Sequence, residues 1–228
     1  MQLLIARHAE TTWNVERRIQ GWTDSPLTTH GTQQARALAD RLRVTKMAAV
    51  YSSDSQRAVR TAECVALWHD MDVVQMMGLR ESSWGDWEGM TADEISERYP
   101  DLWPKFIARG KDSGDTDADW ETTTVVPNGE SAKSSSDRIG QALEEIRARH
   151  GEGDERVLVV GHGGSLRYMF THVLGIRPGL ARRFHLDNTS LSEIWYTPHH
   201  PPVIHQLNDI SHLAAEPKTT FSHGTDSQ

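Results

Sequence analysis

The chain has 228 residues, of which 37% are hydrophobic and 25% charged, a composition typical of a globular protein with a sizeable core. Its formal net charge of −8 would repel nucleic acid and anionic membranes over most of the surface, so we expect neither as a partner. The single cysteine, Cys64, excludes an intramolecular disulfide, and neither a targeting leader nor a long apolar span is recognisable, which favours a cytoplasmic location.

The first 80 residues alternate strand patterns with helix patterns. Short apolar runs predict strands over 2–7, 48–52 and 72–77. Thr28 is a suitable N-cap for a helix over about 29–43, and Ser53 or Asp54 could cap the next helix. Such alternation is typical of a mostly parallel sheet with helices on both faces.

The regular pattern stops after Glu81. Residues 82–135 contain four of the eight tryptophans and an acidic, glycine-containing stretch over 110–119, and only 91–99 and about 102–109 have helical patterns. We interpret 82–135 as a cap inserted over the core domain. A long surface excursion with a loose loop is the alternative interpretation, and the two are compatible.

Strand and helix patterns resume after this segment. Helices are predicted over 136–150 and 164–174, and strands over 156–161, 191–197 and 202–207. The last two strands are edge candidates that could support a homodimer. The polar tail 214–228 predicts disorder. The sequence therefore indicates one α/β domain over 1–213, a three-layer sandwich whose mostly parallel sheet has one antiparallel edge strand.

Two histidines follow two of the apolar strands. His8 comes after Leu-Leu-Ile-Ala-Arg, and His162 comes after Val-Leu-Val-Val-Gly. Because ligands bind beyond the carboxyl ends of strands in such sheets, we expect both imidazoles in one site. Arg7 and Arg57 could hold an anion there, since a guanidinium is always charged and contacts phosphate at two points. Arg57 also lies in the first turn of its helix, where the helix dipole adds positive charge.

These residue types suit phosphoryl transfer. A neutral imidazole such as His8 can attack phosphorus near neutral pH without a metal, and His162 could donate to a phosphate oxygen. The leaving alkoxide needs a proton, and Glu81 is the best candidate because an enclosed, tryptophan-rich site could raise its pKa. Glu88, Glu94 and Glu97 are competing acids nearby. Arg167, one turn into the helix after His162, could face the pocket or the surface.

Other chemistry finds little support in the sequence. The C-terminal histidines match no tight metal-ligand spacing: His199, His200, His205 and His212. Cys64 lacks the Cys-x5-Arg loop of a cysteine phosphatase, and there is no Gly-x4-Gly-Lys nucleotide loop. We therefore expect neither a metal nor another cofactor.

Four motifs, in order and well spaced, cover most of residues 3–170 and together resemble the histidine phosphatase superfamily (phosphoglycerate mutase-like), phosphatase branch. They are Arg7–Asn14 with Arg18–Gly21 and Asp24–Thr28, then Ser52–Ala62, then Leu79–Gly89, and finally Gly161–Gly164.

The resemblance implies roles for six residues. His8 would be the phosphorylated nucleophile and Glu81 the acid and base. The phosphate would be bound by Arg7, Arg57 and His162, and Asn14 would contact the phosphoryl group. One position departs from the family pattern: Ala9 stands where glycine is usual, and its methyl group could hinder a bulky phosphoester.

The expected function is metal-independent hydrolysis of a small phosphorylated metabolite by a histidine acid-type phosphatase, a phosphoric monoester hydrolase. The stretches Ser82–Gly89 and Pro127–Ser131 resemble the phosphatase branch. A phosphoglycerate mutase using the same phosphohistidine is the first alternative, and an inactive phosphoester-binding protein is the second. The sequence does not identify the ester.

Overall fold

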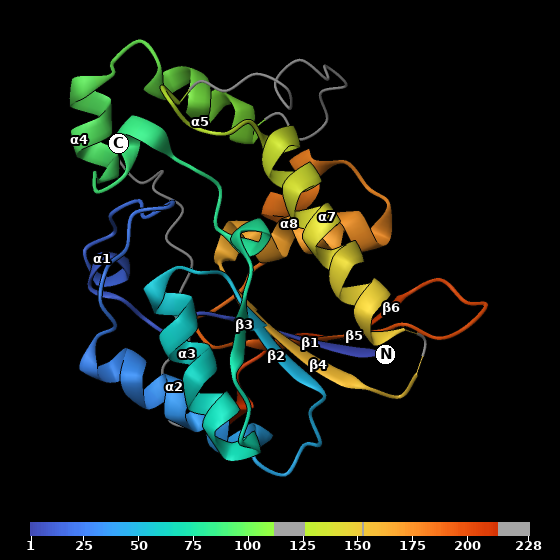
Figure 1. Cartoon of the computed structure of the whole chain (residues 1–228). Helices are drawn as coiled ribbons and strands as arrows, with labels where there is room; N and C mark the ends of the chain where they lie inside the picture. The colour runs from blue at the N-terminus through green and yellow to red at the C-terminus, as the bar shows by residue number, and fades with distance from the viewer. Residues whose placement is uncertain (112–125, 152, 214–228) are drawn as a thin grey trace.

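The computed structural model describes residues 1–111, 126–151 and 153–213 (Figure 1). The predictions for the tail 214–228 and for most of the acidic stretch 110–119 lie outside the described residues.

The described residues form one six-stranded sheet in the order β3-β2-β4-β1-β5-β6. Its strands are β1 (Gln2–Arg7), β2 (Ala49–Ser52), β3 (Val73–Gln75), β4 (Arg156–Gly161), β5 (Leu191–Trp195) and β6 (Val203–Asp209). Strands β1 to β4 are mutually parallel, whereas β5 is antiparallel to β1 and β6 is antiparallel to β5. The predicted fold class, mostly parallel with an antiparallel edge, is confirmed.

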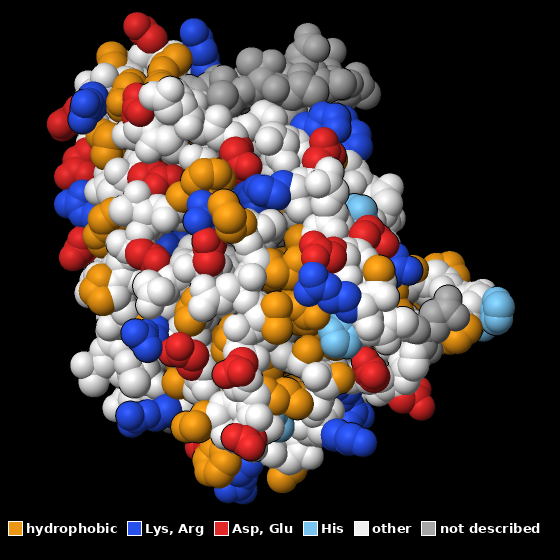
Figure 2. All heavy atoms as spheres, viewed as in Figure 1, with side chains coloured by type: hydrophobic (Ala, Val, Ile, Leu, Met, Phe, Trp, Pro, Cys, Tyr) orange, Lys and Arg blue, Asp and Glu red, His pale blue; other side chains and the backbone are white. Residues whose placement is uncertain are grey.

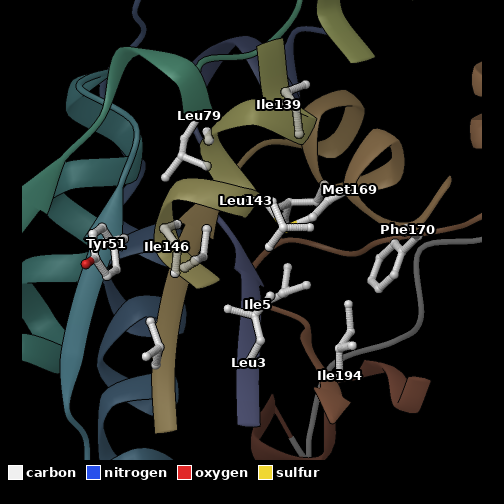
Figure 3. Close-up of a cluster of buried hydrophobic side chains, with 14 of the residues drawn as sticks. Leu3, Ile5, Tyr51, Leu79, Ile139, Leu143, Ile146, Met169, Phe170 and Ile194 are labelled. Carbon is white, nitrogen blue, oxygen red and sulfur yellow. The ribbon is translucent and has the colours of Figure 1, made fainter. Parts of the chain in front are cut away.

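Helices cover both faces of the sheet, which gives three layers. Helices α2 (Thr29–Leu42) and α3 (Gln56–Ala66) pack on one face, and α7 (Ala132–His150) and α8 (Gly163–Leu174) on the other (Figure 1). Figure 3 shows three side chains of α7 directed toward the strands: Ile139, Leu143 and Ile146. All three are fully buried, and each contributes roughly 1.5–3 kcal/mol through the hydrophobic effect.

The register between β1 and β4 places the two predicted histidines side by side. Arg7 is the partner of Gly161, so the next residue on each strand leaves the sheet at the same level. The His8 amide continues the ladder by donating to the carbonyl of Gly161 at 2.9 Å. Both imidazoles therefore emerge at one edge of the sheet because two apolar strands of similar length end together.

Some element boundaries differ from the sequence predictions. Helix α7 begins at Ala132, four residues before the predicted start, because the hydroxyl of Ser131 caps it by accepting from the amide of Ser134 at 3.1 Å. Strand β3 has three residues rather than the six predicted. The short helix α1 (Thr12–Val15) was not predicted; a capping box between Thr11 and Asn14 closes it.

The segment after Glu81 has a small core of its own. It contains the 3₁₀ helix η3 (Gly85–Trp87) and helices α4 (Ala92–Arg98) and α5 (Trp103–Lys111), which lie together at one end of the molecule (Figure 1). Trp87 is fully buried there, and its ring contacts those of Tyr99, Trp103 and Phe106. The division into one domain with a cap over 82–135 stays a prediction.

Acidic and basic side chains are interspersed over the face drawn in Figure 2. Among the described residues, no helix has the length and apolar character needed to cross a membrane.

Candidate active site

A pocket of about 320 Å³ lies beyond the carboxyl ends of β1 and β4. Five of the six predicted site residues line it: Arg7, His8, Asn14, Arg57 and Glu81. The sixth, His162, lies directly behind His8, with 5.3 Å between the ring centroids. The structure thus brings all six into one place, although their chemical roles stay predictions.

His8 is held as a neutral imidazole with one nitrogen available. Its Nδ1 lies 2.8 Å from the carbonyl oxygen of Ala9, which can only accept, so Nδ1 carries the proton and Nε2 keeps its lone pair. Burial lowers the pKa of His8 well below its usual value, and the charges of Arg57 and Arg7 lower it further. A neutral ring with a free Nε2 is the state that a nucleophile requires.

His162 uses both ring nitrogens within the protein. Arg57 donates from Nε to Nδ1 of His162 at 3.2 Å, so the ring proton is on Nε2, which donates to the hydroxyl of Ser53 at 2.7 Å. Burial, followed by the charge of Arg57, lowers the pKa of His162 well below its usual value. In this arrangement His162 orients Arg57. To donate to a phosphate oxygen, Nε2 of His162 would have to give up its hydrogen bond to the hydroxyl of Ser53.

Arg57 lies at the first turn of α3 with only 1% of its side chain exposed. Its Nη1 donates to Asp24 and to the carbonyl of Thr23, and its Nη2 donates to the carbonyl of Gly21. Asp24 also accepts from the amide of Gln56, so this carboxylate occupies the N-terminus of α3. The helix dipole that we expected to act on a bound anion is therefore directed at Asp24.

Arg7 retains binding capacity that the protein does not use. Its Nη1 donates to the carbonyl of Leu186 at 2.7 Å, but its buried Nε has no hydrogen-bond partner in the described part of the chain. Burial and the neighbouring charge of Arg167 lower the pKa of Arg7 to about 10, which still leaves it charged at neutral pH. A buried charge with an unused donor favours an anion beside it.

Asn14 belongs to α1 and presents its amide to the same pocket. Its Oδ1 accepts from the backbone and the hydroxyl of Thr11, both at 3.1 Å. Because the oxygen is used inside the protein, Nδ2 is the end of this side chain that can donate to a ligand.

Glu81 is anchored by the start of α8. Its carboxylate accepts from the amides of Gly164 at 2.8 Å and Ser165 at 2.9 Å, and from that of Ser82 at 2.9 Å. This approach requires glycine at 164, because a Cβ atom there would overlap the carboxylate. The side chain is half-buried, and Trp84 lines the same pocket.

The competing acids have other structural roles. Glu88 accepts from the amides of Trp22, Thr23 and Trp84, which joins the loop before Asp24 to the loop after Glu81. Glu94 caps α4 and pairs with Arg18 at 2.6 Å. Of the acids weighed from the sequence, Glu81 is the one that lines the pocket.

Further pocket residues were not predicted from the sequence, and most come from loops: Arg18, Ile19, Gln20, Ser82, Tyr168 and Arg182. Arg167, for which the sequence left two possibilities, lines the pocket as well. Among the described residues, no group of three or more His, Cys, Asp or Glu side chains is placed to hold a metal ion. Independence from metal stays a prediction.

Comparison with known proteins identifies what the chain resembles. The family model "Histidine phosphatase superfamily (branch 1)" matches residues 3–210. A probable phosphoglycerate mutase, GpmB of Shigella boydii serotype 18, is 36% identical over 219 residues, which cover 94% of this chain and 96% of that protein.

Two solved structures are similar over nearly their whole length. YhfR of Bacillus stearothermophilus has a TM-score of 0.80 and 33% identity, covering 93% of this chain and 98% of the other. A mutant phosphoserine phosphatase of Entamoeba histolytica, in complex with phosphoserine, has a TM-score of 0.77 and 29% identity, with the same coverage.

Proposed function

Because this chain belongs to the histidine phosphatase superfamily, we propose that it hydrolyses small phosphate monoesters in the cytoplasm, without a metal, through a phosphohistidine at His8. One observation carries the proposal. His8 has Nδ1 bound to the carbonyl of Ala9 and a free Nε2, beside the half-buried Arg7 and the buried Arg57 in the pocket. This arrangement suits attack on an anionic phosphorus centre better than binding alone.

The first half-reaction transfers the phosphoryl group to the enzyme. Nε2 of His8 forms a bond to phosphorus while the bond from phosphorus to the ester oxygen breaks. Glu81, protonated at this stage, gives its proton to the leaving oxygen, and the alcohol departs. The phosphorylated ring is then an imidazolium, whose Nδ1–H remains bound to the Ala9 carbonyl.

The second half-reaction restores the enzyme. Glu81, now a carboxylate, takes a proton from water as the water oxygen bonds to phosphorus. The bond from phosphorus to Nε2 breaks, inorganic phosphate leaves, and both side chains return to their starting states. Throughout, Arg7 and Arg57 stabilise the charge on the phosphoryl oxygens, and Nδ2 of Asn14 donates to one of them.

Phosphoglycerate mutase activity is the second candidate, favoured by the name of the 36% identical relative from Shigella boydii. A mutase would share the first half-reaction but would return the phosphoryl group to a substrate hydroxyl instead of water. The two functions therefore differ in the fate of the phosphohistidine and not in its formation.

One experiment separates the candidates. The enzyme is incubated with 3-phosphoglycerate, and both inorganic phosphate and 2-phosphoglycerate are measured, beside ³²P labelling from a phosphodonor. Because the bond from phosphorus to nitrogen in phosphohistidine breaks in acid, the labelling reaction is stopped with alkaline denaturant instead of acid. We expect label on His8 and phosphate release without isomerisation. Dominant isomerisation would replace hydrolysis by the mutase reaction, and ligand binding with neither label nor turnover would indicate an inactive binding protein.

A further inference from the structure

Glu88 is not among the residues that line the pocket, yet its carboxylate holds a loop that does line it. Oε1 of Glu88 accepts from the amide of Trp22 at 2.9 Å and from that of Trp84 at 3.0 Å. Oε2 accepts from the amide of Thr23 at 2.7 Å and also from the Thr23 hydroxyl. Because the acceptor is charged, these four hydrogen bonds are stronger than bonds between neutral groups, and they fix the loop firmly.

The peptide group between Gly21 and Trp22 connects Glu88 to Arg57. Its N–H belongs to Trp22 and donates to Glu88, and its carbonyl belongs to Gly21 and accepts from Nη2 of Arg57 at 2.6 Å. The carboxylate polarises this peptide group, which makes the Gly21 carbonyl a better acceptor for the guanidinium. Glu88 is therefore a counter-charge that acts on Arg57 through one peptide group. Burial lowers the pKa of Arg57, and the charge of Glu88 is among those that oppose this lowering.

The backbone at position 21 is fitted to the Glu88 carboxylate. Gly21 has a φ of +57°, which favours glycine, and a Cβ atom there would lie 2.0 Å from Oε1 of Glu88. Glycine thus allows the carboxylate to approach the loop closely enough to bind its amides.

Arg57 uses four of its five N–H bonds within the protein. Nε donates to His162, and Nη1 donates to the carbonyl of Thr23 and to Asp24. Nη2 donates to the Gly21 carbonyl, so one N–H of Nη2 is left without a partner among the described residues. A misplacement of about 1 Å in such a group can cost about 10²-fold in rate, so the contact that directs Nη2 matters for the reaction.

We propose that Glu88 is a positioning residue for the phosphate site: it holds the Gly21–Trp22 peptide, and this peptide directs the remaining N–H of Arg57 at the phosphoryl group. The inference rests on the proposed function, because the ligand of Arg57 is the phosphoryl group of the substrate. A competing role passes through the acid, since Nε1 of Trp22 donates to the carbonyl of Glu81 at 2.8 Å. The experiments distinguish the two roles.

The first experiment measures the affinity for inorganic phosphate, which binds without turnover. Glu88→Gln keeps the size of the side chain but replaces one acceptor oxygen by an NH₂ group that faces donors of the loop. We expect calorimetric titration to show phosphate bound about tenfold more weakly, because the loop and the Arg57 fork are displaced. Unchanged affinity would overturn the inference. Tighter binding would overturn it as well, since Glu88 would then act only as a charge that repels the ligand.

Asp86→Asn is the matched control for this experiment. It removes the same charge two residues away, from an exposed carboxylate whose partner is the side chain of Asn128. The affinity of this variant for phosphate should equal that of the wild type. An equal loss in both variants would show a general effect of charge and would contradict a specific role of Glu88.

A double-mutant cycle tests whether the effect passes through Arg57. Arg57→Lys keeps a positive charge, and hence a measurable affinity, but lacks the fork that the Gly21 carbonyl directs. Adding Glu88→Gln to Arg57→Lys should therefore weaken phosphate binding by less than about twofold. Full additivity of the two losses would place the action of Glu88 elsewhere. If Glu88→Gln does not fold, Thr23→Val, which removes one donor to Oε2, replaces it in the cycle with an expected loss of about threefold.

Turnover separates the competing role and the proposed function. If Glu88 acts through Arg57, Glu88→Gln lowers kcat/KM by the same factor for p-nitrophenyl phosphate and for an alkyl phosphate, because both place a phosphoryl group beside Arg57. A loss confined to the alkyl phosphate would mean that Glu88 acts through Glu81, and the inference would fail. If the wild-type protein turned over no ester but the phosphate-binding cycle gave the expected coupling, the proposed function would fail and the inference would stand.

Discussion

The floor and the rim of the pocket are built in different ways. The floor consists of His8 and Arg57, with His162 and Ser53 behind them, and all four residues are at most 3% exposed. Hydrogen bonds to other protein groups hold each of these side chains, including the contacts from Arg57 to His162 and from His162 to Ser53. The rim consists of Arg18, Trp84, Arg167 and Arg182, which come from loops, the 3₁₀ helix η4 (Pro178–Arg183) and one face of α8 and are at least partly exposed.

This difference separates the chemistry from the choice of substrate. A floor whose side chains are each fixed by hydrogen bonds keeps one geometry, which an attacking nitrogen needs. A rim with unused donors, such as Nε of Arg167, is completed only by a ligand. Substitutions in the floor should therefore change the rate for every ester, whereas substitutions in the rim should change which ester is preferred.

The largest expected effect is at the nucleophile. His8→Ala removes the atom that forms the covalent intermediate, so we expect kcat for p-nitrophenyl phosphate to fall by at least about 10⁴-fold. His205→Ala is the matched control, because His205 is exposed and stacks on Trp195 in the distant β5–β6 pair. Wild-type turnover by His8→Ala would overturn the proposed mechanism.

The second effect is at the acid. Glu81→Gln should lower kcat by about 10²- to 10⁴-fold for alkyl phosphates, because their alkoxide must be protonated as it leaves. The loss in the phosphoryl-transfer step should be smaller for p-nitrophenyl phosphate, whose leaving group is stable as an anion. Pre-steady-state release of nitrophenol measures that step, and Glu97→Gln, on the exposed face of α4, is the control. An equal loss for both leaving groups in this step would contradict the assignment.

A third prediction concerns the small core under the rim. Trp87→Ala removes a fully buried ring from a cluster with few other members, so the free energy of unfolding should fall by about 3–5 kcal/mol. Urea denaturation measures it, and Trp68→Ala, whose side chain is about half exposed, should change stability by much less. A loss below about 1 kcal/mol would mean that this cluster contributes little to the folded state.

The smallest effect is in the pH dependence of stability. Burial lowers the pKa of His8 and His162 in the folded state below the ordinary value of 6.5, so below that pH the unfolded chain binds protons that the folded chain does not. Stability contributed by the neutral rings is present above pH 6.5 and is lost as pH falls. Each histidine should contribute a slope of about 1.4 kcal/mol per pH unit in this window.

Urea denaturation at pH 7.5, 6.5 and 5.5 measures this slope. His8→Ala should reduce it by the share of one histidine, because it removes one of the two groups. An unchanged slope would show that the pKa of His8 is not lowered in the folded protein.

The parts of the site that rest on the strands could be predicted from the sequence. Strands β1 and β4 are buried on both faces and therefore have unbroken apolar runs, and a histidine after each run marks the edge of the sheet. The alternation of strands and helices then indicated the three layers. Resemblance in the motifs added Asn14, whereas Glu81 was already the best candidate acid before the motifs were compared.

The rest depends on contacts that local patterns do not encode. Asp24 meets Arg57 across 33 residues of sequence, and Glu88 meets Trp22 across 66, both through loops. Arg167 was ambiguous because helical periodicity alone does not say which face borders a cavity. The roles of Glu81 and Glu88 could not be separated by spacing, since both follow β3 in irregular chain, and only the packing of α8 against Glu81 distinguishes them.

The glycine at position 164 gives experimental access to the phosphorylated intermediate. Alanine there would displace the Glu81 carboxylate without changing any charge in the chain, because its methyl group would occupy the space of the carboxylate. An ester whose leaving group needs no proton would still phosphorylate His8. Hydrolysis of the phosphohistidine would be slow, because the attacking water would lack its base. The Gly164→Ala protein would then accumulate in its phosphorylated form, long-lived enough to be isolated and offered different acceptor alcohols.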